Sequence, residues 1–345
     1  MCRTPALGGR VEQCGQCDFT RIVYNSCRNR HCPKCQSLAR ARWVQSRKEE
    51  LLPVEYYHVV FTLPEPVAAL AFQNPEVVYP ILFDAAAETL LTIARDPQHL
   101  GAGIGFFAIL HTWGQKLDYH PHLHCVVPGG GLAPDGSRWI ACRPGFFLSV
   151  RVLSRLFRRL LLEALEKAAR QGQLPLPIDL APLRETEWVV YAKPPFGGPQ
   201  QVLEYLGRYT HRTAISNQRL LALEDGRVTF QWKDYRHPDQ KKAMQLDAPE
   251  FLRRFLMHVL PNGFQRIRYY GFLANCQRRE GLALCRRLLS VPVSELLPQP
   301  RDYRALHQAL TAESLSRCPH CRCGVMLVIQ TLPEYRWPAR PIDSS

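Results

Sequence analysis

The sequence lacks any stretch that would place it in a membrane. No run reaches the roughly eighteen apolar residues that a spanning helix needs, and Met1 to Gly9 contains no apolar signal-peptide core. We therefore expect a cytoplasmic protein without a membrane partner. The sequence also lacks a glycine-rich loop followed by Lys-Ser or Lys-Thr, so the common nucleotide-phosphate site is absent and chemistry that requires ATP is not expected.

Acidic residues are scarce relative to basic ones. The 345 residues include 30 Asp and Glu against 44 Lys and Arg, which gives a formal net charge of +14. This excess favours a polyanion partner such as nucleic acid, and the alternative is solvated surface charge alone. The length permits a full core and two or three domains. Thirteen cysteines, most of them near the two ends, favour metal ligation over disulfides in a reducing compartment.

Residues 1–50 form a cysteine-rich module. Two CxxC pairs are separated by fourteen residues, and this spacing predicts a closed, structural four-cysteine zinc site. The predicted ligands are Cys14, Cys17, Cys32 and Cys35. Three further residues, Cys2, Cys27 and His31, either exchange into that site or belong to a second one.

The same module is basic. Arg28, Arg30 and Lys34 lie within or beside the cysteine pairs, and Tyr24 and Trp43 are available to stack on bases. We expect these residues to contact nucleic acid. The alternative is a zinc clip that only folds the amino terminus.

Three histidines lie in a predicted β-hairpin between Gly105 and Val127. Side chains alternate across a strand, so His122 and His124 share a face, and His111 and Gln115 on the incoming strand can meet them. A single histidine on an apolar strand is usually structural. Two at this spacing with a third opposite predict a metal site, because clustered imidazoles repel one another when protonated.

Further elements are predicted around this hairpin. The runs Tyr56–Leu63 and Glu187–Lys193 read as strands, Ser149–Gln171 as an amphipathic helix capped by Ser149, and residues 220–233 as a hairpin. The helical leucines of Ser149–Gln171 are expected to be core residues.

Paired tyrosines follow the proline-rich break after Lys193. Tyr205 and Tyr209 are four residues apart in a stretch with helical spacing, so their hydroxyl groups lie on one face, flanked by Arg208 and Arg212. Tyrosines at this spacing are usually packing residues. Beside arginines and a histidine metal site they indicate nucleophiles for a phosphodiester, with the arginines offsetting the developing charge.

The last fifty residues contain half of a zinc ribbon, with Cys318, Cys321 and Cys323. Its partners are not evident from spacing, and Cys276 and Cys285 are candidates. The tail from Leu332 to Ser345 is rich in proline and is expected to be disordered.

These motifs, taken in order, resemble a known family. The stretch Tyr57–Pro64, the His-x-His of His122 and His124, and the tyrosines of Tyr205–Arg212 follow a cysteine module, as in rolling-circle transposases of the insertion-sequence ninety-one family. That family belongs to the HUH (histidine, hydrophobic, histidine) endonucleases. The resemblance extends from Cys2 to about Val291.

The resemblance implies an α+β fold with an antiparallel central sheet flanked by helices, a catalytic Mg²⁺ or Mn²⁺ ion, and single-stranded DNA at transposon ends as the substrate, with target DNA as a second partner. It makes His122 and His124 metal ligands and Tyr205 and Tyr209 nucleophiles that form 5′-phosphotyrosine. His111 is the preferred third ligand, with Gln115 retained.

Four segments are expected from these motifs. They are a zinc-binding DNA-contact module at 1–50, the nuclease domain at 51–235, a basic helical extension at 236–299, and the half-ribbon with its tail at 300–345. Alternative functions are a rolling-circle replication initiator or relaxase and, in another class, a catalytically inactive zinc-dependent DNA-binding protein.

Overall fold

The computed structural model divides the chain into two compact units. The first combines the amino-terminal residues Met1–Trp43 with the carboxy-terminal residues Glu295–Ser345, and the second is Val44–Ser294. The structure describes residues 2–32, 37–175, 179–193, 214–234, 240–291 and 314–335, with Gln201, Leu203, Gly207 and Gln308. The ends of the chain thus form one unit, whereas the sequence predicted two separate segments.

The second unit is built on a five-stranded sheet with the order β12-β4-β5-β3-β8, in which every neighbouring pair is antiparallel. Its strands are β3 (Tyr56–Thr62), β4 (Gly105–Trp113), β5 (Tyr119–Pro128), β8 (Val190–Lys193) and β12 (Ile267–Gly271). Strands β4 and β5 are the predicted histidine hairpin. The α+β class with an antiparallel central sheet is confirmed.

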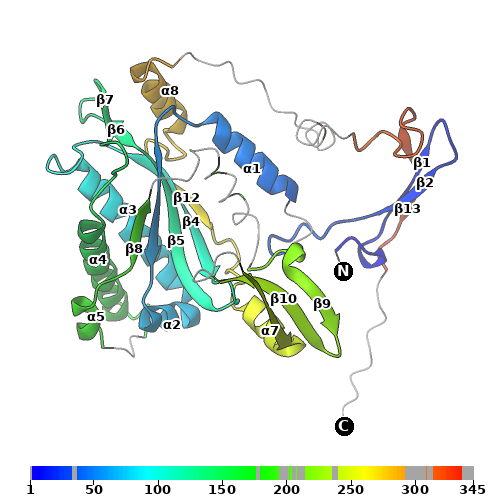
Figure 1. Cartoon of the computed structure of the whole chain (residues 1–345), viewed down its shortest axis with the longest axis horizontal. Coiled ribbons are helices and arrows are strands. Elements are labelled where there is room, and N and C mark those ends of the chain that lie inside the picture. Colours follow the sequence, from blue (N-terminus) through cyan, green and yellow to red (C-terminus); the bar gives the residue numbers. More distant parts are fainter. Residues whose placement is uncertain are drawn as a thin grey trace, which may run out of the picture. The chain divides into compact units, whose positions relative to one another are not determined.

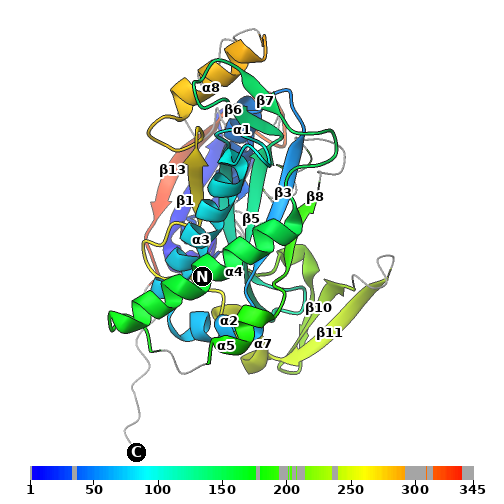
Figure 2. The same cartoon turned by 90° about the vertical axis from the view of Figure 1, so that its left-hand side faces the viewer.

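Helices cover one face of this sheet (Figures 1 and 2). They are α2 (Glu65–Gln73), α3 (Pro75–Arg95) and α4 (Val150–Arg170), with the short α5 (Ala181–Glu185) beside α4. Phe61, Leu110 and Leu123 point from the strands into the core that these helices close, and all three are fully buried. Ser149 precedes α4, but its side chain makes no capping hydrogen bond.

Helix α3 is the one described helix that is long and apolar enough to cross a membrane. Its buried side chains lie in the same core as those of α4 and the sheet. It is therefore a core helix, because its apolar residues already have protein neighbours.

Smaller elements complete the second unit. They are β6 (Gly130–Leu132) with β7 (Trp139–Ala141), the sheet of β9 (Leu220–Glu224), β10 (Arg227–Lys233) and β11 (Lys241–Asp247), and the helices η2 (Asn217–Arg219), α7 (Ala248–Leu256) and α8 (Arg278–Leu288). Trp113 and Leu117 from the β4–β5 hairpin pack with Phe230 of β10. This contact joins the second sheet to the end of the hairpin nearest the histidines.

The first unit contains a three-stranded antiparallel sheet. Its strands are β1 (Gly9–Cys14), β2 (Thr20–Tyr24) and β13 (Met326–Leu332), with β1 in the centre, and a short helix η1 (Pro5–Leu7) precedes them. Strand β13 falls where the sequence predicted only a half-ribbon and the start of a tail. Helix α1 (Ser37–Glu49) contains the boundary between the two units.

Candidate metal centres

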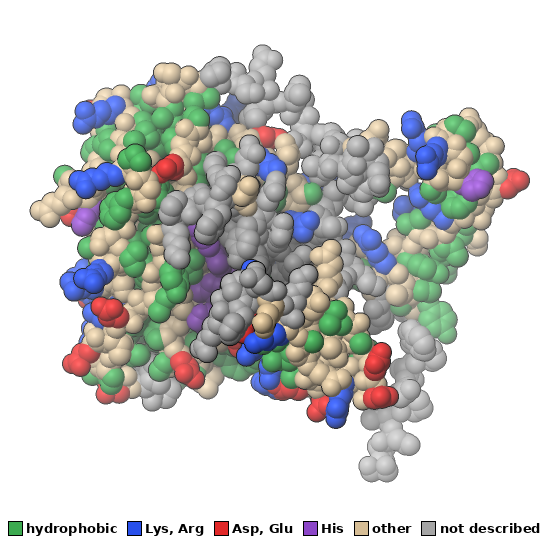
Figure 3. Space-filling model, in the orientation of Figure 1, with side chains coloured by type: hydrophobic (Ala, Val, Ile, Leu, Met, Phe, Trp, Pro, Cys, Tyr) green, Lys and Arg blue, Asp and Glu red, His purple; other side chains and the backbone are tan. Residues whose placement is uncertain are grey.

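Three histidines converge on the face of the central sheet opposite to helices α2, α3 and α4. His111 of β4 lies directly across from His122 of β5, and His124 lies two residues further along β5. One ring nitrogen from each residue lies within 4.8 Å of the others. Figure 3 shows a group of histidine side chains gathered on one side of the molecule. The alternation that buries Leu110 and Leu123 among the helices turns these three side chains to the other face.

Hydrogen bonds orient two of the rings. The Nδ1 atom of His122 donates to the carbonyl oxygen of His120 at 2.6 Å. The Nδ1 atom of His124 lies 2.6 Å from Nε2 of His58, a residue of the neighbouring strand β3. In both rings the hydrogen bond uses Nδ1, so Nε2 is the nitrogen that remains for a metal ion. In His124 this Nε2 is buried and has no hydrogen-bond partner among the described residues.

The rings are held in the neutral form. Burial lowers the pKa of His122 to about 4. Burial, together with the neighbouring imidazoles, holds the pKa values of His111 and His124 well below the ordinary value. Only a neutral imidazole has the lone pair that binds a metal ion, so the site is ready to bind one at neutral pH. A buried Nε2 without a partner in His124 fits the same role.

Gln115 lies in the turn after β4 and not on the strand itself. Its side-chain oxygen accepts a hydrogen bond from the backbone N–H of Lys233 at 3.3 Å, and its carbonyl oxygen accepts one from Arg219. The side-chain oxygen is thus directed to strand β10. His111 is the third residue that the described structure groups with His122 and His124.

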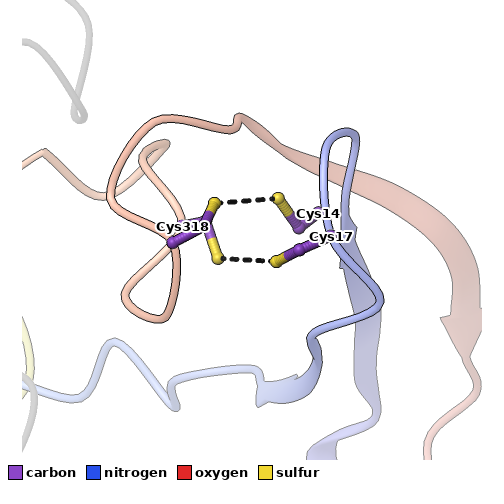
Figure 4. Close-up of side chains that lie close together, drawn as sticks. Cys14, Cys17 and Cys318 are labelled. Carbon is purple, nitrogen blue, oxygen red and sulfur yellow. Dashed lines mark hydrogen bonds between the residues drawn. The ribbon is translucent and has the colours of Figure 1, made fainter.

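Four cysteine thiols meet in the first unit, but they are not the predicted four. Cys14 and Cys17 lie against Cys318 and Cys321, with Sγ···Sγ distances of 3.7 Å for Cys14 and Cys321 and 3.8 Å for Cys17 and Cys318 (Figure 4). A tetrahedral zinc ion with bonds of about 2.3 Å to sulfur sets its ligands about 3.8 Å apart. The four thiols therefore fit a structural zinc ion.

Backbone N–H groups donate hydrogen bonds to two of the four sulfur atoms in this cluster. Gln16 donates to the Sγ atom of Cys14 at 3.4 Å, and Gly324 donates to that of Cys321 at 3.3 Å. The N–H group of Gly324 lowers the pKa of Cys321 to about 6. Thiolates are the form of cysteine that binds zinc.

The pairing differs from the sequence prediction for a topological reason. Strand β13 pairs with β1 so that Cys14 lies opposite Met326, which brings Cys318 and Cys321 next to Cys14 and Cys17. Sequence spacing alone favoured Cys32 and Cys35, which are closer along the chain. Cys32 instead lies beside Cys2 and Cys27. Cys35 and Lys34 lie outside the described residues.

Comparisons with known proteins identify the family. The model described as "Putative transposase" matches residues 105–280, and that of a "Transposase zinc-binding domain" named for IS91 matches residues 1–63. The chain is 60% identical to "Putative transposase y4qJ" of Sinorhizobium fredii (strain NBRC 101917 / NGR234), over 100% of this chain and 90% of that protein.

The chain belongs to the IS91 family of transposases. It is also 31% identical to the "Transposase for insertion sequence element IS801" of Pseudomonas savastanoi pv. phaseolicola, over 79% of this chain and 68% of that protein. The zinc-binding module and the transposase region therefore both have family counterparts.

Among solved structures, this transposase is similar to the metal-bound conjugative relaxase TrwC in complex with oriT DNA. The identity is 14%, the match covers 69% of this chain and 72% of that chain, and the TM-score is 0.27. A TrwC complex with a 27-mer DNA matches at 15% identity, 69% and 75% coverage, and a TM-score of 0.23. The strand order and register given above therefore describe the fold of this chain without reference to these structures.

The predicted nucleophiles of the transposase lie outside the described residues. This holds for Tyr205 and Tyr209 and for the flanking Arg208 and Arg212. Their neighbours Leu203 and Gly207 are helical, and Leu203 is fully buried.

The predicted DNA-contact arginines lie in the loop that follows β2. Arg28 and Arg30 both belong to it, and Arg28 has a left-handed backbone with φ of 51°. His58 was not predicted to act at the site. Its place in an otherwise apolar alternating strand was the one available signal.

Proposed function

We propose that this transposase cuts single-stranded DNA at the ends of its element through a tyrosine nucleophile and transfers the strands by rolling-circle transposition. The observation that carries the proposal is the convergence of His111, His122 and His124 on one face of the antiparallel sheet. Family membership supplies the reaction class, DNA transposition. The paired tyrosines of the sequence supply the chemistry that is proposed.

In this proposal the three histidines hold Mg²⁺ or Mn²⁺ through their Nε2 atoms. A bound divalent ion polarises the non-bridging oxygens of the scissile phosphate. His58 accepts the Nδ1 proton of His124 and thereby keeps the Nε2 lone pair directed at the ion. Because imidazoles suit softer ions better than Mg²⁺, we expect Mn²⁺ to bind more tightly than Mg²⁺.

The proposed covalent step uses Tyr205 or Tyr209. The phenol oxygen loses its proton to solvent and attacks phosphorus, which forms a 5′-phosphotyrosine bond and breaks the bond to the 3′ oxygen. That oxygen leaves as a 3′-hydroxyl after taking a proton from water. A 3′-hydroxyl can later attack the phosphotyrosine and reverse the step, so no ATP is consumed. Arg208 and Arg212 are proposed to offset the charge on the phosphate.

The same proposal assigns DNA contacts to the amino-terminal module, through Arg28, Arg30 and Lys34. The net charge of +14 supports a polyanion partner. Both single-stranded element ends and target DNA are proposed substrates, and the cytoplasm is the proposed location. The nuclease domain is proposed to lie at 51–235, with 236–299 as its basic extension.

The experiment that tests this proposal is strand cleavage by the full chain. Single-stranded oligonucleotides with 5′ and 3′ labels, taken from the element ends, are incubated with Mn²⁺ and resolved on a denaturing gel. We expect a free 5′-labelled fragment that ends in a 3′-hydroxyl and a 3′-labelled fragment that migrates with the protein. Both should be lost in Tyr205→Phe/Tyr209→Phe and in His124→Ala. His120→Ala is the matched control and should retain cleavage. Binding without cleavage across all candidate ends would support the inactive DNA-binding alternative.

A further inference from the structure

We propose that Lys116, Trp232 and Lys242 bind single-stranded DNA beside the three-histidine site. The inference rests on the proposed function, because it assigns a further contact for the same substrate. Lys116 lies in the turn between β4 and β5, Trp232 on β10 and Lys242 on β11. The ammonium groups of Lys116 and Lys242 lie 4.4 Å and 5.6 Å from the centroid of the Trp232 ring. We call these three residues the lysine–tryptophan patch.

Trp232 lies where one face of the second sheet stops being apolar. Side chains alternate along β10, so Trp232 shares a face with Phe230. Phe230 is fully buried, and Met244, its cross-strand partner, packs in the same cluster, as does Phe255 of α7. The next pair along the same face is Trp232 with Lys242. The Trp232 ring is therefore left partly exposed, with a lysine directly across from it.

The hairpin turn holds Lys116 against this ring. The carbonyl oxygen of Gln115 accepts a hydrogen bond from Arg219, and the carbonyl oxygen of Lys116 accepts one from Arg254 at 3.2 Å. Leu117 is fully buried in the cluster between the hairpin and the second sheet. These contacts fix the backbone around Lys116, so the approach of its side chain to the ring follows from the fold.

The surroundings of the lysine–tryptophan patch carry more positive than negative charge. Lys242 forms an ion pair with Asp234 at 2.7 Å. Lys116 forms no ion pair within the described part of the chain. With the exposed Lys233, three lysines outnumber Asp234 and Asp118, the carboxylate in the same turn. Ammonium groups that meet at one ring repel each other, and an anion between them removes that repulsion. The patch therefore fits an anionic partner.

A phosphate group joined to a flat base suits this arrangement. Proteins that bind single strands combine cationic side chains for the phosphates with aromatic rings on which bases stack. An exposed lysine binds only weakly to an indole face, and its long stem is flexible. A DNA phosphate can therefore draw the Lys116 ammonium from the ring, and a base can take its place there. Duplex DNA keeps its base faces inside the stack, so it can use the lysines but not the ring.

The lysine–tryptophan patch lies close to the three histidines. His111 and Lys116 are five residues apart in the sequence, and a chain spans at most about 3.6 Å per residue, so their Cα atoms are separated by no more than about 18 Å. Figure 1 shows β9, β10 and α7 beside the turn that joins β4 to β5. A stacked DNA strand rises about 3.4 Å per nucleotide. The patch therefore holds the strand within about five nucleotides of a phosphate at the histidines.

Affinity for single-stranded DNA tests the inference. The full chain is titrated without divalent cations into fluorescently labelled strands from the element ends, and anisotropy gives the dissociation constant. We expect Trp232→Leu to weaken binding by about fivefold or more, because a stacked base loses its ring, and Trp232→Phe to retain most of the affinity. Lys116→Gln should weaken binding and reduce the salt dependence by about one phosphate contact.

The matched control is Lys167→Gln. Lys167 is an exposed lysine of α4, which covers the opposite face of the central sheet, so this variant should bind like the wild type. Unchanged affinity in both Trp232→Leu and Lys116→Gln would overturn the inference. Equal losses for single-stranded and duplex DNA in Trp232→Leu would also overturn it. If Trp232→Leu does not fold, Lys116→Gln decides alone, because Lys116 is exposed.

Strand length shows where the lysine–tryptophan patch contacts the DNA. Strands are shortened stepwise from the 5′ or from the 3′ end. Shortening from one end should, at some length, remove the difference in affinity between Trp232→Leu and the wild type. Where cleavage is mapped, that length should lie within about five nucleotides of the cut.

Cleavage of the same strands with Mn²⁺ separates this inference from the proposed function. Wild-type cleavage, with no effect of either variant on binding, overturns the lysine–tryptophan patch alone. Binding that depends on Trp232 and Lys116 without any cleavage supports the patch and contradicts the tyrosine nuclease.

Discussion

The Nδ1 atom of His124 lies 2.6 Å from Nε2 of His58, and the two rings stack with their centroids 4.9 Å apart. The two residues come from neighbouring strands, β5 and β3. Burial lowers the pKa of His58 to about 4, so this ring is neutral and can accept the Nδ1 proton of His124. In the proposed metal site, His58 is thus a positioning residue for His124.

Replacing His58 by alanine should weaken metal binding without removing a ligand. Loss of an orienting partner to a metal-bound histidine typically costs 10–100-fold in affinity, and we expect Mn²⁺ affinity to fall by about that factor. Isothermal titration calorimetry measures it. His58→Gln retains a hydrogen-bond acceptor and should recover part of the loss. Equal affinity in wild type and His58→Ala would show that His58 only packs against His124.

Substitution of His111 and of Gln115 separates the two candidates for the third ligand. His111→Ala should abolish Mn²⁺ binding or reduce it by at least tenfold, because it removes one of three grouped imidazoles. Gln115→Ala should leave affinity nearly unchanged, because the Gln115 oxygen already accepts from Lys233. Electron paramagnetic resonance of free Mn²⁺ reports both. The opposite ranking would make Gln115 the ligand.

Mn²⁺ should stabilise the second unit against heat. An ion that binds only the folded state at one hundred times its dissociation constant adds about 2.7 kcal/mol to the free energy of unfolding. Differential scanning fluorimetry should therefore show a higher melting temperature with Mn²⁺ in the wild type and no shift in His124→Ala. His120→Ala is the control and should shift like the wild type. An equal shift in His124→Ala would place Mn²⁺ elsewhere.

Glu50 should make the folded protein less stable as the pH rises, which is the reverse of the effect of a carboxyl group whose pKa is lowered by folding. Burial raises its pKa even though Arg47 donates to it at 2.6 Å and Arg278 and Arg286 are nearby. A carboxyl group whose pKa is raised by folding stabilises the folded protein at pH values below its unfolded pKa of 4.5. That stabilisation is lost as the pH rises through the pKa of the folded protein.

Relative to Glu50→Gln, the wild type should therefore lose stability between about pH 4.5 and neutrality. Urea unfolding of both proteins at a series of pH values gives this difference in the free energy of unfolding. A wild type that gains stability over the glutamine variant as the pH rises would mean that the arginines outweigh burial.

Local patterns were sufficient to predict the histidine hairpin. The apolar run Gly105–Leu110, the polar turn Gly114–Asp118 and the apolar exit Cys125–Val127 predicted the hairpin of β4 and β5. The shared face of His122 and His124 followed from the period of two. The neighbour of β4 on the outer side, β12, was not predicted, because strand pairing between residues about 160 apart has no local signal. His58 was missed for the same reason, since its role depends on which strand lies beside β5.

The zinc cluster shows the same limit. The CxxC spacing correctly indicated metal ligation, but spacing cannot say which two pairs meet. Strand β13 pairs with β1 across more than 300 residues, and that register decides that Cys318 and Cys321 face Cys14 and Cys17. The Cys-Pro-His-Cys sequence at Cys318–Cys321 was the available signal. It was recognised as half of a site without its partner.

The most direct test of the tyrosine chemistry is the identification of the residue that becomes linked to DNA. The full chain is incubated with single-stranded element ends and Mn²⁺, digested with nuclease and trypsin, and analysed by tandem mass spectrometry. We predict a nucleotide attached through phosphate to Tyr205 or Tyr209 and no adduct in His124→Ala. A cleaved strand without any protein adduct, or an adduct on another residue, would contradict it.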